Sequence, residues 1–219
     1  MAGRKNGSRP SPFYNMKKNN QKTDFFKNFN QAYYTTDSYD DYLRRYQKEG
    51  LCSASNLIKK IKPLRSWHFL DVGCGMGGVV LALRSLNYQA WGTEVSPYCL
   101  KFSPAKEWLQ FADICNLPFL SNSFEVITCV DVLCYLNRDE TKQTVKELTR
   151  VAKHYLGVET ICRGSPNSDQ IKNPDWLRQD RYLLPENDLR RMFLANRTFF
   201  REPLYPRQQN TDFNGLFVK

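Results

Sequence analysis

The stretch FLDVGCGMGG, residues 69–78, decides the fold class that the sequence predicts. The apolar run from Trp67 to Val72 stops just before Gly73, the first glycine of the stretch, and predicts a buried strand. The segment from Gly78 to Leu86 has an apolar face and predicts a helix. Glycines at such a junction let the backbone turn tightly and approach a ligand without Cβ atoms in the way. The N-terminus of the helix presents free N–H groups, which suit a phosphate or a carboxylate. The stretch therefore predicts a ligand-binding corner between a strand and a helix.

Strands and helices alternate along the chain beyond this corner. Further strands are expected at 90–95, 108–113, 124–130 and 155–161. Two helices are expected to begin after the N-cap residues Ser96, which Pro97 follows, and Asn137. A helix at 185–195 and two adjacent strands, 198–204 and 213–218, complete the pattern. Alternation of this kind implies a parallel sheet covered by helices on both faces. The predicted fold class is α/β: a Rossmann-like, doubly wound, mostly parallel seven-stranded sheet with an antiparallel edge strand.

The 219 residues fit one domain with a short appendage. Residues 1–23 hold six Lys and Arg and no acid, so most of the net charge of +10 lies in a tail. This basic tail fits a flexible, solubilising terminus, a nucleic-acid arm or, less well, an organellar transit peptide. Residues 24–66 contain five Tyr and two short helical segments, 40–46 and 53–62, and are expected to form a helical, aromatic cap. Residues 67–219 then form the Rossmann-like domain.

Composition excludes several other classes. No apolar run approaches the ~20 residues that a membrane span requires, and the polar N-terminus is not a secretory signal. The seven Cys are widely spaced without a C-x-x-C pair and the two His lie far apart, so no metal site is expected. An odd number of Cys without a secretion signal favours reduced thiols and a cytoplasmic protein.

The glycines alone fit two kinds of nucleotide site, because three of them also match the dinucleotide pattern G-x-G-x-x-G. Asp71 lies two residues before the first glycine, where a carboxylate would repel a pyrophosphate but can accept hydrogen bonds from the ammonium group of S-adenosylmethionine. Glu94 ends the second strand and suits a ribose, and Asp113 ends the third, where it can accept from an adenine amino group. Acids at three successive strand ends therefore favour S-adenosylmethionine as the cofactor.

Together these motifs resemble the class I methyltransferases, in particular the methyltransferase type 11 group. The resemblance runs from Phe69 to Ile161 and includes DICNLPF at 113–119 and FEVITCVDVLCY at 124–135. It implies a set of cofactor-binding residues: Asp71, Gly73, Cys74, Gly75, Gly77, Glu94, Val95, Asp113, Ile114 and Asp131. In this arrangement Asp71 and Gly73 lie near the methionine, Glu94 on the ribose, and Val95, Asp113 and Ile114 around the adenine. The Gly-Gly turn that the family usually has before the fifth strand is replaced here by Lys153-His154.

Methyl transfer needs an acceptor held close to the methyl group and a base only if the acceptor must lose a proton. Asp131 and Tyr135, where the fourth strand opens, are the catalytic candidates. Acceptor specificity is expected from the Tyr-rich cap and from a lid inserted at 163–184. The cap would fold over the cofactor, so that Tyr33, Tyr34 or Tyr42 contacts its sulfonium or methionine.

A small-molecule acceptor is favoured, because no RNA-binding module is recognisable and the body of the domain is nearly neutral. One alternative is an RNA or DNA methyltransferase that uses the basic tail as an arm. Another is a non-catalytic scaffold that binds S-adenosylmethionine without turnover. A dinucleotide oxidoreductase is disfavoured by Asp71. The oligomeric state stays open.

Overall fold

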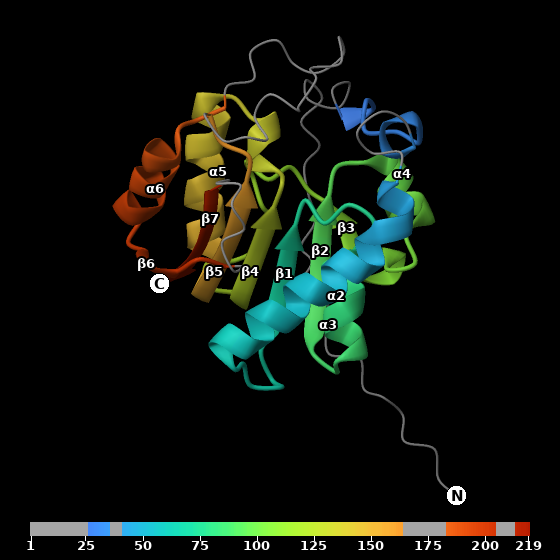
Figure 1. Ribbon diagram of the computed structural model, residues 1–219, viewed down its shortest axis with the longest axis horizontal. Coiled ribbons are helices and arrows are strands. Elements are labelled where there is room, and N and C mark those ends of the chain that lie inside the picture. Colours follow the sequence, from blue (N-terminus) through green and yellow to red (C-terminus); the bar gives the residue numbers. More distant parts are fainter. Residues whose placement is uncertain (1–25, 36–40, 164–182, 205–212) are drawn as a thin grey trace, which may run out of the picture.

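A seven-stranded sheet runs through the computed structural model, which describes residues 26–35, 41–163, 183–204 and 213–219 (Figure 1). Its strands are β1 His68–Val72, β2 Gln89–Glu94, β3 Leu109–Phe111, β4 Phe124–Val130, β5 Ala152–Thr160, β6 Phe199–Glu202 and β7 Phe213–Val218. The order is β3-β2-β1-β4-β5-β7-β6, with β1 to β5 parallel and β7 antiparallel to both β5 and β6. The predicted fold class is confirmed, and the antiparallel strand lies one position inside the edge formed by β6.

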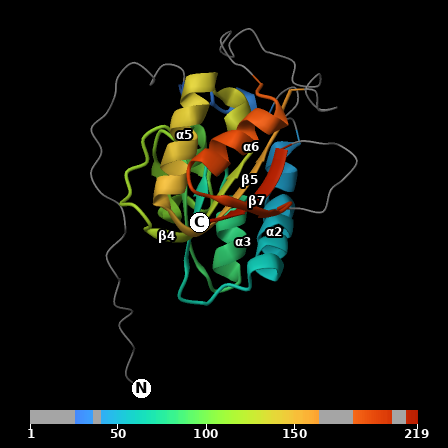
Figure 2. The ribbon, with the colours of Figure 1, turned by 90° about the vertical axis from the view of Figure 1, so that its left-hand side faces the viewer.

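Helices cover both faces of the sheet (Figures 1 and 2). They are α2 Tyr42–Ile61, α3 Gly78–Ser85, α4 Pro97–Phe102, α5 Arg138–Val151 and α6 Glu186–Ala195, with short 3-10 turns η1 Ala32–Tyr34, η3 Lys106–Trp108 and η4 Leu133–Tyr135. Leu57 of α2 packs in one core cluster with Phe69, and Leu148 of α5 packs in another with Leu70. Because successive side chains of a strand point to opposite faces, both faces of β1 are buried, as in a parallel sheet between two helical layers.

Local capping explains where two of these helices begin. The Ser96 side chain accepts a hydrogen bond from the Cys99 N–H at 3.1 Å, with Pro97 as the first helical residue. Asn137 accepts from the N–H of Glu140 at 2.9 Å, and the Glu140 carboxylate accepts from the Asn137 N–H at 3.1 Å. Both predicted helix starts are thus confirmed.

The cap departs from the prediction in one respect. The two short helices expected at 40–46 and 53–62 form one 20-residue helix, α2, which crosses one face of the sheet (Figure 1). Gly50 lies in its middle at the crossing with α3, where a Cβ atom would overlap the backbone of Gly78. Since the two backbones touch here, the glycine marks a close helix contact and not a break in the helix.

The third strand is shorter than predicted. It ends at Phe111, so Asp113 lies two residues beyond it in a turn. The predicted tail at 1–23 and nearly all of the predicted lid at 163–184 lie outside the described residues. Within the described ranges, no helix is long and apolar enough to cross a membrane.

Candidate active site

A cavity of about 250 Å³ lies at the carboxyl ends of β1, β2 and β4. The cavity is lined by every predicted cofactor-binding or catalytic residue except Gly77. The lining residues among them are Asp71, Gly73, Cys74, Gly75, Glu94, Val95, Asp113, Ile114, Asp131 and Tyr135. Gly77 is instead the residue before α3, and a Cβ atom there would press on Ala105. The glycine corner, the strand ends and the η4 turn therefore share one hollow.

The corner is shaped by backbone that only glycine adopts readily. Gly75 has a φ of +52°, in the left-handed region. A Cβ atom on it would overlap the hydroxyl group of Tyr42, which accepts a hydrogen bond from the Met76 N–H at 3.0 Å. The cap helix α2 therefore contacts the glycine turn directly, through a tyrosine hydroxyl.

Two buried carboxylates flank this corner. Asp71 is 5% exposed and accepts from the Thr128 hydroxyl at 2.7 Å. Glu94 is 6% exposed; one of its oxygens accepts from the Gly75 N–H at 2.7 Å, and the other from the N–H groups of Val95 and Ser96 at 2.7 and 2.8 Å. The side chain of Glu94 thus holds the end of β2 against the glycine turn.

Burial disfavours the charged form of both acids. It raises the pKa of Asp71 to about 6. The hydrogen bond from Thr128 lowers this pKa, and the negative charge of Glu94 raises it further. Burial also raises the pKa of Glu94, although the three backbone N–H groups oppose that rise. A cationic group entering the cavity would stabilise both carboxylates in their ionised form.

Asp113 lies on the same cavity although it no longer ends a strand. Its carboxylate accepts from the Cys115 N–H at 2.9 Å, and its carbonyl accepts from the Asn116 N–H at 2.9 Å. This local turn, not the strand, orients the side chain.

The end of β4 brings the two catalytic candidates to the cavity. Asp131 has a φ of +55°, a conformation that aspartate tolerates better than most residues, and its N–H donates to the Glu159 carbonyl at 2.9 Å. Tyr135, in η4, has its hydroxyl 2.6 Å from that of Tyr33 in the cap. The cap and the end of β4 are therefore joined by a hydrogen bond between two side chains that line the cavity.

The aromatic cap forms part of the cavity wall. Tyr33, Tyr34 and Tyr42, which the sequence suggests for contacts to the sulfonium or methionine of the cofactor, all line it. The segment before α2 is fixed to the sheet by the Ser96 hydroxyl, which donates to the Phe29 carbonyl at 2.5 Å. The cap therefore packs against the carboxyl ends of the strands.

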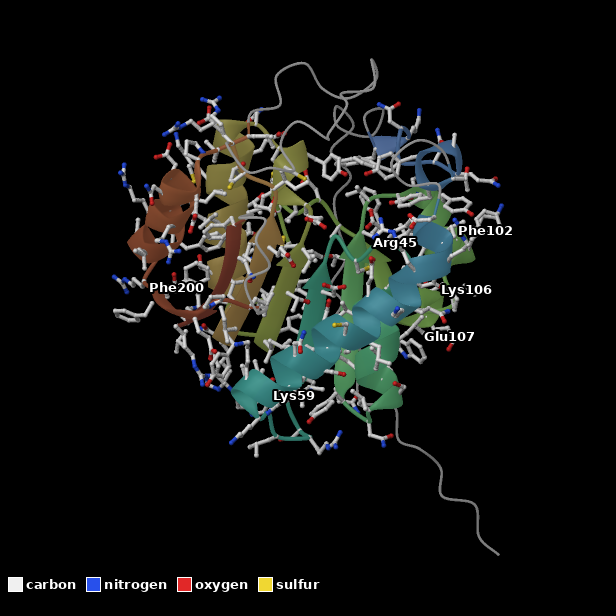
Figure 3. The ribbon with its side chains drawn as sticks, viewed as in Figure 1. Arg45, Lys59, Phe102, Lys106, Glu107 and Phe200 are labelled. Atoms are coloured by element: carbon white, nitrogen blue, oxygen red, sulfur yellow. The ribbon has the colours of Figure 1, made fainter. Side chains whose placement is uncertain are left out.

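Several lining residues were not foreseen from the sequence. Those on α2 are Arg45, Tyr46, Glu49, Gly50 and Ser53, and Phe26 and Phe29 precede η1. The α2 residues follow Tyr42 at intervals of three and one, which is the spacing of one helix face. That spacing would have identified them if the two predicted helices had been joined. Figure 3 shows Arg45 near the N-terminal end of α2.

In the described ranges, no group of three or more His, Cys, Asp and Glu side chains is arranged to hold a metal ion.

Comparisons with known proteins agree with the class that this geometry suggests. Residues 70–155 match a family model described as a methyltransferase domain. This match and the sheet order confirm the predicted resemblance: the chain has the fold of the S-adenosylmethionine-dependent class I methyltransferases.

Individual relatives are distant. The chain is 30% identical over 121 residues to an uncharacterized protein of Methanocaldococcus jannaschii, and the match covers 54% of this chain and 52% of that protein. The chain thus spans about half the length of this curated relative.

Two solved structures show the same fold at low identity. Magnesium protoporphyrin IX methyltransferase from Synechocystis PCC 6803 with bound S-adenosylhomocysteine is 17% identical, with a TM-score of 0.63 over 92% of this chain and 95% of that one. The complex between the Haloferax volcanii Trm112 methyltransferase activator and a proposed methyltransferase gives a match with 18% identity and a TM-score of 0.59, over 73% of each chain. At these identities the likeness shows the fold alone.

Proposed function

We propose that this chain binds S-adenosylmethionine in the cavity and transfers its methyl group to a small-molecule acceptor. The observation that carries the proposal is the pairing of a left-handed glycine turn with two buried carboxylates, Asp71 and Glu94, on one cavity. The family model matched by residues 70–155 and the fold shared with proteins crystallised with S-adenosylmethionine or S-adenosylhomocysteine support it.

The residues present fit this cofactor. A ligand with an ammonium group would offset the burial of Asp71, whose pKa is raised to about 6 by desolvation. Glu94 at the end of β2 and Asp113 near β3 would provide acceptors for ribose hydroxyls and an adenine amino group, as the family resemblance implies. Val95 and Ile114, which follow Glu94 and Asp113 in the sequence, also line the cavity and would supply apolar contacts for a base.

When bound, S-adenosylmethionine supplies a methyl group on a positive sulfonium, which leaves by in-line displacement. The task of the chain is to hold the acceptor in line and to exclude water. Tyr33 and Tyr135 close one side of the cavity through their 2.6 Å hydroxyl contact. Asp131, which lines the cavity, would accept a proton from an acceptor that must lose one.

The small-molecule acceptor is proposed from the lack of a recognisable RNA-binding module and from the nearly neutral body of the domain. The cavity of about 250 Å³ is lined by residues of η1, α2 and η4 beside the strand ends, and a volume of this order suits a cofactor with a small acceptor. The RNA or DNA alternative rests on the basic tail at 1–23, outside the described residues. The scaffold alternative predicts that the chain binds S-adenosylmethionine but does not transfer its methyl group.

Calorimetric titration with S-adenosylmethionine tests the cofactor site. We expect micromolar binding, weakened at least tenfold, or about 1.4 kcal/mol, by Asp71→Ala or Glu94→Ala, because each removes a charged hydrogen-bond partner. The matched control is Glu107→Ala, an exposed acid on η3 outside the cavity (Figure 3). Folded variants with wild-type affinity would remove both assignments.

A labelled methyl donor added to fractionated cell extract tests the acceptor class. Label in metabolites supports the proposal. Label in nucleic acid, lost when residues 1–23 are deleted, supports the alternative. Binding without any transfer supports the scaffold.

A further inference from the structure

The segment between β3 and β4, residues 112–123, contains no helix or strand. Two of its residues, Asp113 and Ile114, line the cavity at the end that the proposed function assigns to adenine. Because an irregular segment forms no ladder of backbone hydrogen bonds, its buried N–H and C=O groups need other partners. The geometry of the adenine end therefore depends on the groups that hold this segment in place.

An ion pair on α5 binds the backbone of the segment. Glu147 is 8% exposed and accepts from the Leu117 N–H at 2.8 Å. Arg150 donates to the Leu117 carbonyl at 3.0 Å and to the Phe119 carbonyl at 2.7 Å. The same guanidinium donates to both carboxylate oxygens of Glu147, each at 2.8 Å. Two side chains on one face of α5 thus hold three backbone groups of the segment.

This ion pair is better suited to fixing a geometry than to adding stability. Removing two charges from water is costly, and their mutual attraction repays that cost only with good geometry and further hydrogen bonds. Here the further hydrogen bonds go to the backbone of residues 117 and 119. The planar guanidinium of Arg150 holds a carboxylate and two carbonyl groups at once, which the single ammonium group of a lysine does not reproduce.

A closed turn connects this ion pair to Asp113. The Asp113 carboxylate accepts from the Cys115 N–H at 2.9 Å, and its carbonyl accepts from the Asn116 N–H at 2.9 Å. The Cys115 sulfur lies 3.5 Å from the hydroxyl of Thr144, which is also on α5. Leu117, held by the ion pair, is the next residue after this turn. A shift of residues 117–119 would therefore move the turn that orients the Asp113 carboxylate.

We infer that Glu147 and Arg150 are positioning residues that set the selectivity of the site for the purine base. The inference rests on the proposed function, in which Asp113 accepts a hydrogen bond from the amino group of adenine. Neither Glu147 nor Arg150 lines the cavity, so they act through the backbone of the segment that carries Asp113. Hydrogen bonds weaken steeply when distance and angle change, so a displaced Asp113 distinguishes bases poorly.

The test compares two ligands that differ only in the purine base, S-adenosylhomocysteine and S-inosylhomocysteine. The second has a carbonyl oxygen where adenine has its amino group, so the Asp113 carboxylate would face an acceptor in place of a donor. We expect calorimetry on the wild-type chain to show at least tenfold tighter binding of S-adenosylhomocysteine. The ratio of the two affinities is the quantity that the variants should change.

Arg150→Lys and Arg150→Met should each lower this ratio at least fivefold, as should Asp113→Ala. Combining Arg150→Lys with Asp113→Ala should lower it no further than Asp113→Ala alone, because both changes remove the same recognition of the base. The matched control is Lys146→Met, which changes an exposed basic residue of α5 and should leave the ratio unchanged. Arg150→Lys keeps a positive charge beside Glu147, so it provides the test even if Arg150→Met does not fold.

The outcomes separate this inference from the proposal on which it rests. Failure of S-adenosylhomocysteine to bind the wild-type chain overturns the proposed function. Binding of both ligands with equal affinity overturns the role of Asp113 at the adenine and, with it, the inference. A wild-type ratio in folded Arg150→Lys, with both affinities unchanged or lowered equally, overturns the inference alone, because a merely structural ion pair would give that result.

Discussion

Replacing Asp71 by Asn should stabilise the ligand-free protein and at the same time weaken its binding of S-adenosylmethionine. Asp71 is almost fully buried beside Glu94, and its one hydrogen bond to a side chain comes from Thr128. Asparagine has nearly the same volume and keeps an oxygen to accept that bond, while the buried charge is removed. The variant therefore separates the requirement of folding from the requirement of ligand binding.

The pKa of Asp71 gives the magnitude. A pKa raised from 3.8 to about 6 corresponds to about 3 kcal/mol of stability lost through ionisation at neutral pH. Below about pH 4 both folded and unfolded chains are protonated and Asp71 has no effect. Between about pH 4 and 6 the unfolded chain ionises first, so stability falls as the pH rises, and above about pH 6 the full loss is present. Because the new amide also needs partners for its N–H donors, we expect a net gain of about 1–3 kcal/mol for Asp71→Asn at pH 7.

Thermal and urea unfolding of the ligand-free proteins measure this gain. For a chain of this length, 1–3 kcal/mol corresponds to an increase in Tm of roughly 2–12 °C. The gain should be about half as large at pH 5, because wild-type Asp71 is then mostly protonated in the folded chain. Asp113→Asn, a partly exposed acid on the same cavity, is the control and should not stabilise the protein. A destabilised Asp71→Asn variant, or a gain that does not change with pH, would refute the reasoning.

Three further predictions concern the cap and the ionisation of the cavity. Gly50→Ala should destabilise the protein by about 2 kcal/mol or more in urea unfolding, because the new methyl group overlaps the Gly78 backbone, whereas the same change inside an ordinary helix stabilises it. Tyr33→Phe and Tyr135→Phe should each weaken S-adenosylhomocysteine binding several-fold, because each removes the 2.6 Å contact between the two hydroxyls in the cavity wall; unchanged affinity in both folded variants would contradict this. Calorimetry between pH 5 and 7 should show cofactor affinity rising about tenfold with pH, as the acid whose pKa is raised to about 6 ionises; a flat profile would argue against a buried carboxylate facing a cation.

Local rules were sufficient to predict the parts of the site that one short segment forms by itself. The glycine corner, the cap at Ser96 and the capping box at Asn137 each depend on residues within a few positions of one another. Asp71 and Glu94 were found because parallel strands end at one edge of a sheet, so strand-end acids must lie near each other. These features follow from chain geometry before any tertiary packing is known.

Other features depend on contacts that no local pattern reveals. Gly50 looks like a helix breaker in the sequence, but the backbone of α3 packs against it and α2 continues through it. The strand before Asp113 stops early, and a turn held by its own side chain brings the carboxylate to the cavity. Arg45 and the other lining residues of α2 could be placed only once that helix was continuous.

The cap and the glycine corner form one structural unit, which bears on how acceptor specificity is set. The Tyr42 hydroxyl accepts a hydrogen bond from the Met76 N–H and occupies the space that a Cβ atom on Gly75 would need. In the same way, Gly50 of α2 packs against Gly78 at the start of α3. The position of α2 is therefore fixed by the same glycines that shape the cofactor corner. Under the proposed function, side chains elsewhere on the cap, such as Tyr33, would differ between chains of this fold without moving the corner. The common motif thus fixes the frame for the cap, and we expect the cap to contribute to the choice of acceptor.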